Sequence, residues 1–99
     1  MNIIKKQDGA TLKVSLEGRL DTVTAPQLEG ELRSAVSGIS ELVFDLGALD
    51  YVSSAGLRVL LSAQKVMNKQ GSMIIRNVKP EIMEIFEVTG FVDILNIEE

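Results

Sequence analysis

Residues 42–61 read LVFDLGALDYVSSAGLRVLL, and this stretch decides the fold. Its first part, residues 42–46, is apolar except for Asp45 and hardly alternates, which is typical of a short strand covered on both faces. A loop with two adjacent hydroxyls, Ser53 and Ser54, follows and leads into a strongly apolar segment. The stretch therefore predicts a buried strand that continues into a buried helix, as in α/β proteins.

The apolar segment after this loop has helical spacing, and we predict a helix over 54–70 with Gly71 as its C-cap. Its polar residues recur so that they form one narrow exposed stripe, which consists of Arg58, Ser62, Lys65 and Lys69. Apolar residues make up most of the remaining surface of the helix, so we expect it to be mostly buried. A solvated helix face is enough to explain the stripe, and we assign it no role.

Toward the N-terminus the sequence predicts a hairpin and a helix. Asp8-Gly9 separates Ile3-Ile4 from residues 11–17, which alternate apolar and polar side chains, and this pattern predicts a β-hairpin. After residue 21 the spacing becomes helical near Thr24-Ala25-Pro26, with Thr24 as the N-cap. The residues expected on the inner face of this helix are Leu28, Leu32, Ala35, Val36 and Ile39.

Toward the C-terminus, residues 73–75 predict a short strand, and Pro80-Glu81 open a third helix that ends at Gly90. Residues 91–97 are predicted to form a last, edge-like strand. Strands therefore alternate with helices after the first hairpin. This order predicts an α/β fold in a single domain over residues 1–99, with a mixed β-sheet, an N-terminal hairpin, about three helices and right-handed crossovers.

The composition excludes several classes of chemistry. The 99 residues include no Cys, His or Trp, so the chain has no means to form disulfides, thiolate nucleophiles, zinc fingers or histidine-dependent triads. Fourteen acidic and ten basic residues give a net charge of -4, which argues against nucleic-acid binding. The sequence has neither an apolar run of membrane-spanning length nor the apolar region of a signal peptide. We therefore expect a cytoplasmic protein that has no membrane span and needs no cofactor.

The loop before the predicted helix 54–70 is the strongest candidate for a functional site. Ser54 would stand at the helix N-terminus, where unpaired N–H groups and the positive end of the helix dipole favour an added phosphate. The alternative is structural, because Ser53 or Ser54 can serve simply as the N-cap. Gly56 also has a structural interpretation, as a residue small enough to let the start of the helix pack against the sheet.

An enzyme is a second possibility left open by the residues. Asp21, Asp45 and Asp50 could converge at the ends of strands and hold Mg²⁺ through carboxylate oxygens. The simpler interpretation places Asp45 in a strand and the other two in turns. The chain has no phosphate-binding loop of the G-x-x-x-x-G-K-S/T type, so binding of ATP by this chain is not expected.

Three segments carry a resemblance to a known family: residues 50–61, DYVSSAGLRVLL; residues 17–21, EGRLD, followed by Thr24-Ala25; and residues 88–91, VTGF. They look like the signature loop and helix, the segment after the second strand, and the end of the third helix of STAS domains. The resemblance is specifically to the bacterial anti-sigma factor antagonists. The three matches occur in the family's order and spacing, and they are distributed over essentially all 99 residues.

The resemblance implies a regulatory cycle. An unphosphorylated antagonist of this family binds an anti-sigma factor that is also a serine kinase, and the sigma factor is released for transcription. Phosphorylation by the kinase ends the binding, and a serine phosphatase restores it. The family's phosphorylated serine matches Ser54, with Ser53 as a weaker alternative, and the expected partner-binding residues are Asp21, Ser53, Ser54 and Gly56. We also expect a monomer that is not an enzyme and binds no metal.

The residues around Ser54 depart from the family pattern. Ser53 stands where many antagonists have an acidic residue, Ala55 where they have a second hydroxyl, and Arg58 where they often have a second glycine. These changes keep the acceptor hydroxyl and alter its surroundings. A second role within the family also stays open, because small STAS proteins serve as adaptors in sensory complexes or as accessory subunits of lipid-transport ATPases without a phosphorylation switch.

Charge offers a physical account of such a switch. Asp21 and Asp50 are expected to lie near the loop, so a phosphate on Ser54 would strengthen a negative field at the contact surface. Like-charge repulsion and desolvation of charged groups weaken an interface. One modification could therefore end binding without a change of fold.

Overall fold

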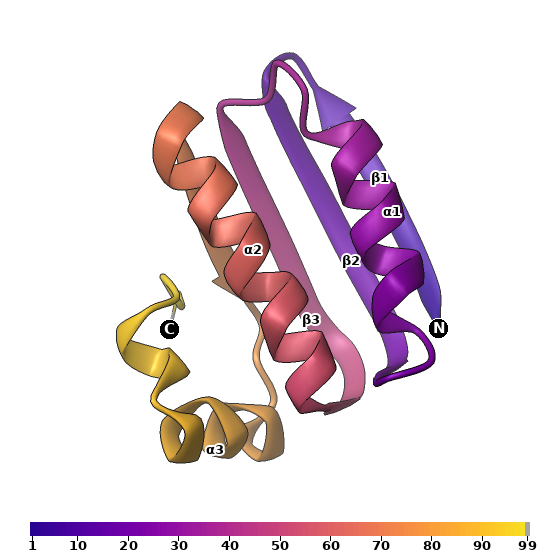
Figure 1. The fold of residues 1–99 in the computed structure, drawn as a ribbon, viewed down its shortest axis with the longest axis vertical. Helices are drawn as coiled ribbons and strands as arrows, with labels where there is room; N and C mark the ends of the chain where they lie inside the picture. The colour runs from indigo at the N-terminus through magenta and orange to yellow at the C-terminus, as the bar shows by residue number, and fades with distance from the viewer. Residues whose placement is uncertain (99) are drawn as a thin grey trace.

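The computed structural model describes residues 1–98, and its four strands form one mixed sheet (Figure 1). The elements in chain order are β1 (Asn2–Asp8), β2 (Thr11–Leu20), α1 (Ala25–Ala35), β3 (Glu41–Val52), α2 (Ser54–Gln70), β4 (Ser72–Arg76), α3 (Pro80–Thr89) and a 3₁₀ helix, η1 (Phe91–Asp93). β1 is antiparallel to β2, whereas β2 and β3, and β3 and β4, are parallel. The predicted α/β fold with a mixed sheet and an N-terminal hairpin is confirmed.

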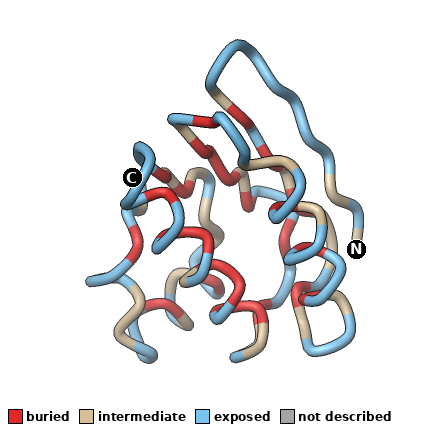
Figure 2. Tube along the Cα trace, turned by 45° about the horizontal axis from the view of Figure 1, so that its top comes forward, coloured by how far each residue is buried: buried red, intermediate tan, exposed pale blue. Residues whose placement is uncertain are grey.

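Two helices cover one face of the sheet. α1 and α2 lie side by side along the strands, and α3 lies crosswise near the end of the sheet where α2 begins (Figure 1). The core is the layer between these helices and the sheet, whereas β1 is exposed along most of its length (Figure 2). Fully buried side chains in this layer include Val14, Leu16, Phe44, Leu46, Leu60 and Met67. Within residues 1–98, no helix combines the length and apolar character needed to cross a membrane.

The predicted hairpin is confirmed, and Thr24 is the N-cap residue of α1 as predicted, although it makes no side-chain cap bond. Asp8 pairs with Thr11, and Gly9 between them has a φ of 61°, a left-handed conformation that favours glycine. Thr24 does precede α1, but its hydroxyl makes no cap bond to the helix. The Thr24 Oγ1 atom instead donates to the Arg19 carbonyl at 2.8 Å and accepts from the Asp21 N–H at 2.8 Å. Its hydroxyl therefore stabilises the turn before the helix.

β3 is much longer than residues 42–46, the strand expected from the sequence. It continues to Val52 because the end of β2 stays paired with it through Leu20. The pairing has register shifts between Ser15 and Glu17 and between Gly18 and Arg19, so the burial pattern loses its regular alternation. Asp50 and Tyr51 consequently lie in the strand, and the expected loop before α2 is reduced to Ser53.

α2 has the bounds that the sequence predicts, but Gly71 ends it for an unexpected reason. Gly71 has a φ of 170°, which is extended backbone open to any residue, so it is not a left-handed cap. A Cβ atom at this position would overlap the backbone carbonyl of Ser40. Close approach of two backbone segments, and not helix-cap geometry, requires glycine here.

The predicted last strand over residues 91–97 is wrong. The chain turns through η1 after Gly90, whose φ of 80° ends α3 in the predicted place. The N–H of Leu95 bonds to the carbonyl of Phe91 at 2.8 Å, so these backbone groups form local bonds and no sheet ladder. Ile97 alone makes a parallel bridge, to Ile75 of β4.

Candidate functional site

The candidate site lies at the end of the sheet where the parallel strands β2 and β3 finish. The N–H of Ser53 donates to the carbonyl of Leu20 at 2.8 Å, which joins the start of α2 to the end of β2. Residues that follow these two strands are therefore neighbours, although about thirty positions separate them in the sequence. In α/β sheets, ligand and partner sites gather at this edge.

The two adjacent serines have different roles. Ser53 is the N-cap of α2: its backbone is extended, and its Oγ atom accepts from the N–H of Gly56 at 3.3 Å. Ser54 is the first residue of the helix, it is exposed, and its hydroxyl has no hydrogen-bond partner in the part of the chain that the structure describes. The structural alternative of a simple N-cap thus applies to Ser53, and Ser54 is left exposed beside it.

Gly56 is buried and positions both serines. A Cβ atom there would lie 2.6 Å from the Cγ atom of Leu20 and 3.0 Å from the Leu20 carbonyl oxygen. A larger residue would push the first turn of α2 away from the end of β2. The packing role considered for Gly56 is confirmed, and Gly56 itself is buried.

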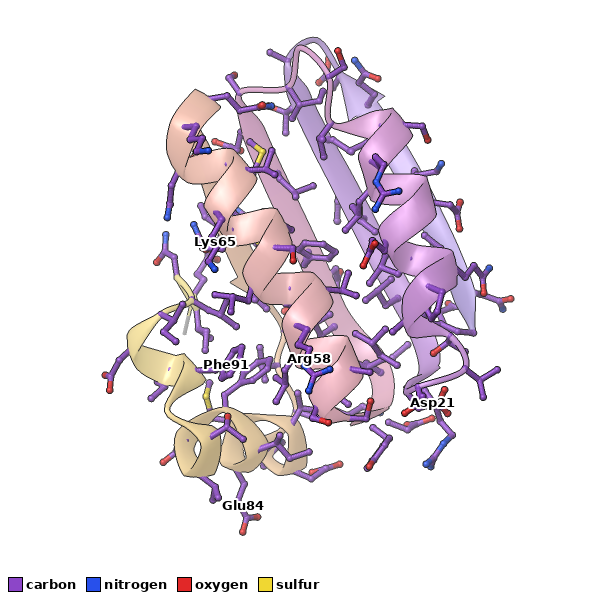
Figure 3. The ribbon with its side chains drawn as sticks, in the orientation of Figure 1. Asp21, Arg58, Lys65, Glu84 and Phe91 are labelled. Atoms are coloured by element: carbon purple, nitrogen blue, oxygen red, sulfur yellow. The ribbon has the colours of Figure 1, made fainter. Side chains whose placement is uncertain are left out.

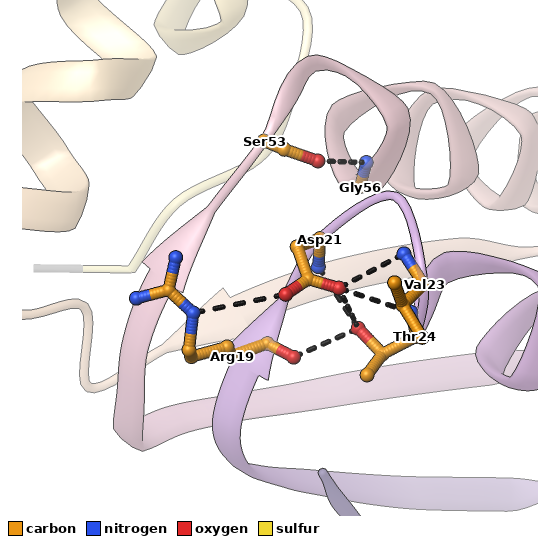
Figure 4. A network of polar contacts seen from close by, with 6 residues as sticks. All are labelled: Arg19, Asp21, Val23, Thr24, Ser53 and Gly56. Carbon is orange, nitrogen blue, oxygen red and sulfur yellow. Dashed lines mark hydrogen bonds and ion pairs between the residues drawn. The ribbon is translucent and has the colours of Figure 1, made fainter.

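Asp21 organises the turn between β2 and α1 (Figure 4). Its Oδ1 atom accepts from the N–H of Val23 at 3.0 Å and from the N–H of Thr24 at 3.1 Å. The bond from the Thr24 N–H is the largest reason that the pKa of Asp21 lies below its ordinary value, and the Arg19 guanidinium 3.7 Å away also lowers the pKa. Asp21 is therefore a carboxylate whose hydrogen bonds hold the turn beside the start of α2.

Two exposed apolar residues border this site and were missed by sequence reasoning. Val23 is 85% exposed at the tip of the turn that Asp21 holds. Tyr51 is 38% exposed near the end of β3, with the Arg19 guanidinium 4.3 Å from the centre of its ring. A valine between two threonines gives no periodic signal, and Tyr51 falls outside the strand that the sequence predicts over 42–46.

The three aspartates considered as a magnesium site belong to separate contacts. The Asp50 carboxylate accepts from the Lys79 Nζ atom at 2.8 Å, on the side of α3. Asp45 accepts from the Gly47 N–H at 3.0 Å, which is the largest cause of its lowered pKa. Asp21 is engaged in its own turn. Over residues 1–98, no group of three acidic residues is arranged to hold a metal ion, so these aspartates do not form the magnesium site considered above.

The start of α2 is a surface suited to negative charge. Its first turn contains no acidic residue. The Ser53 Oγ atom accepts from the Gly56 N–H, and the Ser53 carbonyl accepts from the Leu57 N–H. The positive end of the helix dipole is therefore not balanced by a carboxylate of its own. A phosphate on Ser54 would be placed where helix N-termini favour anions.

Comparison with known proteins identifies relatives along the whole described chain. The family model of the STAS domain matches residues 2–99. BtrV of Bordetella bronchiseptica is 44% identical over 91 residues, which cover 90% of this chain and 78% of BtrV. The anti-sigma-B factor antagonist of Bacillus subtilis is 30% identical over 98 residues, covering 98% of this chain and 90% of that protein. The crystal structure of an anti-sigma factor antagonist from Mycobacterium paratuberculosis superposes with a TM-score of 0.87 at 25% identity, covering 97% of this chain and 83% of the other.

Proposed function

The chain belongs to the STAS domain family of anti-sigma factor antagonists, and from this premise we propose that it is a partner switch controlled by one serine, Ser54. In the unphosphorylated form it binds an anti-sigma factor that is also a serine kinase, and the sigma factor is released. Phosphorylation of Ser54 by that kinase ends the complex. A serine phosphatase removes the phosphate and returns the chain to its binding form.

The observation that carries this proposal is the different placement of two adjacent hydroxyls. The Ser53 hydroxyl accepts from the Gly56 N–H, whereas the Ser54 hydroxyl is exposed on the first turn of α2. A kinase needs an acceptor oxygen that can enter its active site without loss of structure in the substrate. Ser54 meets this requirement, and phosphorylation of Ser53 would remove a helix cap.

The surface around Ser54 fits a protein partner. Asp21 holds the β2–α1 turn so that Val23 projects beside the serines, and Tyr51 and Arg19 form a stacked pair at the same end of the sheet. Tyrosine and arginine are enriched among the residues that carry the binding energy of protein interfaces. A phosphate on Ser54 must lose water when the partner binds, and it adds negative charge to a surface that already carries the Asp21 carboxylate, so the complex weakens.

The proposal is tested by phosphosite mapping and a pull-down with the cognate anti-sigma factor kinase and ATP. The wild-type chain should be phosphorylated at Ser54 and should leave the complex as ATP is consumed. S54A should stay bound and unlabelled. S53A is the matched control, because it removes the neighbouring hydroxyl and should still be labelled.

Two outcomes would contradict the switch. Full phosphorylation of S54A would assign the acceptor to another residue, with Ser53 the first candidate. Stable binding to a transporter ATPase or a sensory complex, without labelling by any kinase, would instead make the chain an accessory subunit or adaptor. The two outcomes are separated by the same mass spectra and by the proteins recovered in the pull-down.

A further inference from the structure

Arg58 lies one helical turn beyond Ser54 on α2. Residues four apart on a helix are neighbours on its surface, and both side chains are exposed. Figure 3 places Arg58 near the start of α2, at the same end of the molecule as Asp21, with Lys65 further along the helix. The stripe to which Arg58 belongs therefore begins beside the free hydroxyl.

The other basic side chains at this end of the molecule already have acidic partners. Arg19 pairs with Asp21 at 3.7 Å, and Lys79 pairs with Asp50 at 2.8 Å. Across the hollow between α1 and α2, Arg33 pairs with Glu29 at 2.6 Å. Arg58 lines the same hollow, and no carboxylate of residues 1–98 lies within 4.0 Å of its guanidinium. Among these cations, Arg58 is the one left available for a new anion.

We propose that Arg58 is the intramolecular receptor of the phosphate on Ser54. This inference rests on the proposed phosphorylation of Ser54 and adds the residue that responds to it. The guanidinium binds the phosphate oxygens through two N–H groups, as arginine does with planar or tetrahedral oxyanions. Phosphorylation then changes the surface twice, because it adds a phosphate and withdraws a free guanidinium from any acidic group of the partner.

The order of charges along the helix favours this pair. An anion at the start of a helix and a cation four residues later follow the orientation of the helix dipole, which makes this the better of the two arrangements. The first turn of α2 holds no carboxylate that would compete for Arg58. The Glu29–Arg33 pair on α1 has the same order and spacing, so this fold already contains one example of the contact.

The test uses the full chain with phosphoserine incorporated at position 54 by genetic encoding, so that no kinase is needed. A ³¹P NMR titration gives the proton affinity of the phosphate in the wild type and in R58Q. Loss of the guanidinium should raise that affinity roughly twofold to threefold, since Arg58 favours the dianion. R58K should restore part of the effect, and K65Q, which removes a cation further along the same stripe, should have none.

A second readout reports the contact directly. The Nε–Hε signal of Arg58 should shift on phosphorylation in ¹⁵N spectra, and the shift should decrease at high salt. Equal titration curves for wild type and R58Q, or an unmoved Arg58 signal, would overturn the inference. Both results are independent of partner binding, so they are distinguishable from failure of the proposed switch, which would appear as a phosphorylated wild-type chain that still binds its kinase.

Discussion

The two ends of α2 are packed in similar ways and differ in what they leave exposed. At each end a glycine lets the helix approach another segment closely: Gly56 packs against Leu20, and Gly71 packs against the backbone of Ser40. At the C-terminal end the Gln70 Nε2 atom donates to the carbonyl of Val36 at 2.8 Å and to that of Ile39 at 2.6 Å. Polar groups at that end are therefore bonded within the fold, and we call it the closed end.

The N-terminal end of α2, which we call the open end, leaves polar and apolar side chains exposed around it. Ser53 caps the helix, but the hydroxyl of Ser54, the side chain of Val23 and the guanidinium of Arg58 project from the surface. The C-terminal end of the helix therefore stabilises the fold, whereas the N-terminal end presents exposed groups on closely packed backbone. Substitutions at the two ends should accordingly separate loss of stability from loss of binding.

The largest effect is expected from G71A at the closed end. A methyl group there would overlap the Ser40 carbonyl, and backbone atoms cannot move aside as a side chain can. We expect a loss of about 3 kcal/mol in the free energy of unfolding, measured by denaturant titration. G30A is the matched control, because Gly30 lies in α1 with nothing near its Cβ position, and it should gain about 1 kcal/mol. Equal effects of the two substitutions would show that close approach does not require Gly71.

A smaller loss is expected from G56A at the open end. Its new methyl group meets mainly the Leu20 side chain, which can shift, and alanine also improves helix propensity. We expect a net loss of about 1 to 2 kcal/mol. Because the first turn of α2 must move, G56A should also weaken the partner complex in the pull-down, although Gly56 itself is buried. A variant with unchanged stability and unchanged binding would argue against this packing role.

The two serines give a third comparison within the open end. S53A removes the cap bond to the Gly56 N–H and should cost about 1 kcal/mol of stability. S54A removes an exposed hydroxyl and should change stability by less than about 0.5 kcal/mol. Thermal unfolding of the two purified variants measures both values. If S54A proved the less stable, the assignment of the cap to Ser53 would be wrong.

The sequence predicts the parts of this fold that depend on local signals. The period of its apolar residues defines α2 over its full length, and the Asp8-Gly9 turn defines the hairpin. Ser54 could be singled out because the segment around it resembles a known signature. The helix and the hairpin depend on spacing along the chain, which periodicity can detect, whereas the choice of Ser54 rests on the resemblance.

The remaining features depend on contacts between distant segments. β3 extends to Val52 because β2 pairs with it through two register shifts, and no local pattern predicts that pairing. Residues 91–97 have a strand-like composition, yet local hydrogen bonds direct them into η1. The exposure of Val23 and the division of roles between Ser53 and Ser54 follow from the tertiary position of the Asp21 turn and the start of α2. Tertiary packing thus decides which of two adjacent hydroxyls remains free.

The smallest effect is expected from the pH dependence of the Asp21 turn. The fold lowers the pKa of this carboxyl below its ordinary value of 3.8, chiefly through the hydrogen bond from the Thr24 N–H. The folded chain therefore stabilises the ionised form of Asp21. This contribution to the free energy of unfolding is complete above the ordinary pKa. That contribution is lost as the pH falls through the lower pKa of the folded state.

D21N keeps an oxygen that can accept from Val23 and Thr24, so it should retain the turn and decrease the loss of thermal stability between pH 6 and pH 2. D45N is the control for a second carboxyl with a lowered pKa far from Ser54, and it should change acid sensitivity without changing partner binding. An unchanged acid response in D21N would mean that hydrogen-bond geometry, and not the charge of Asp21, holds the open end in place.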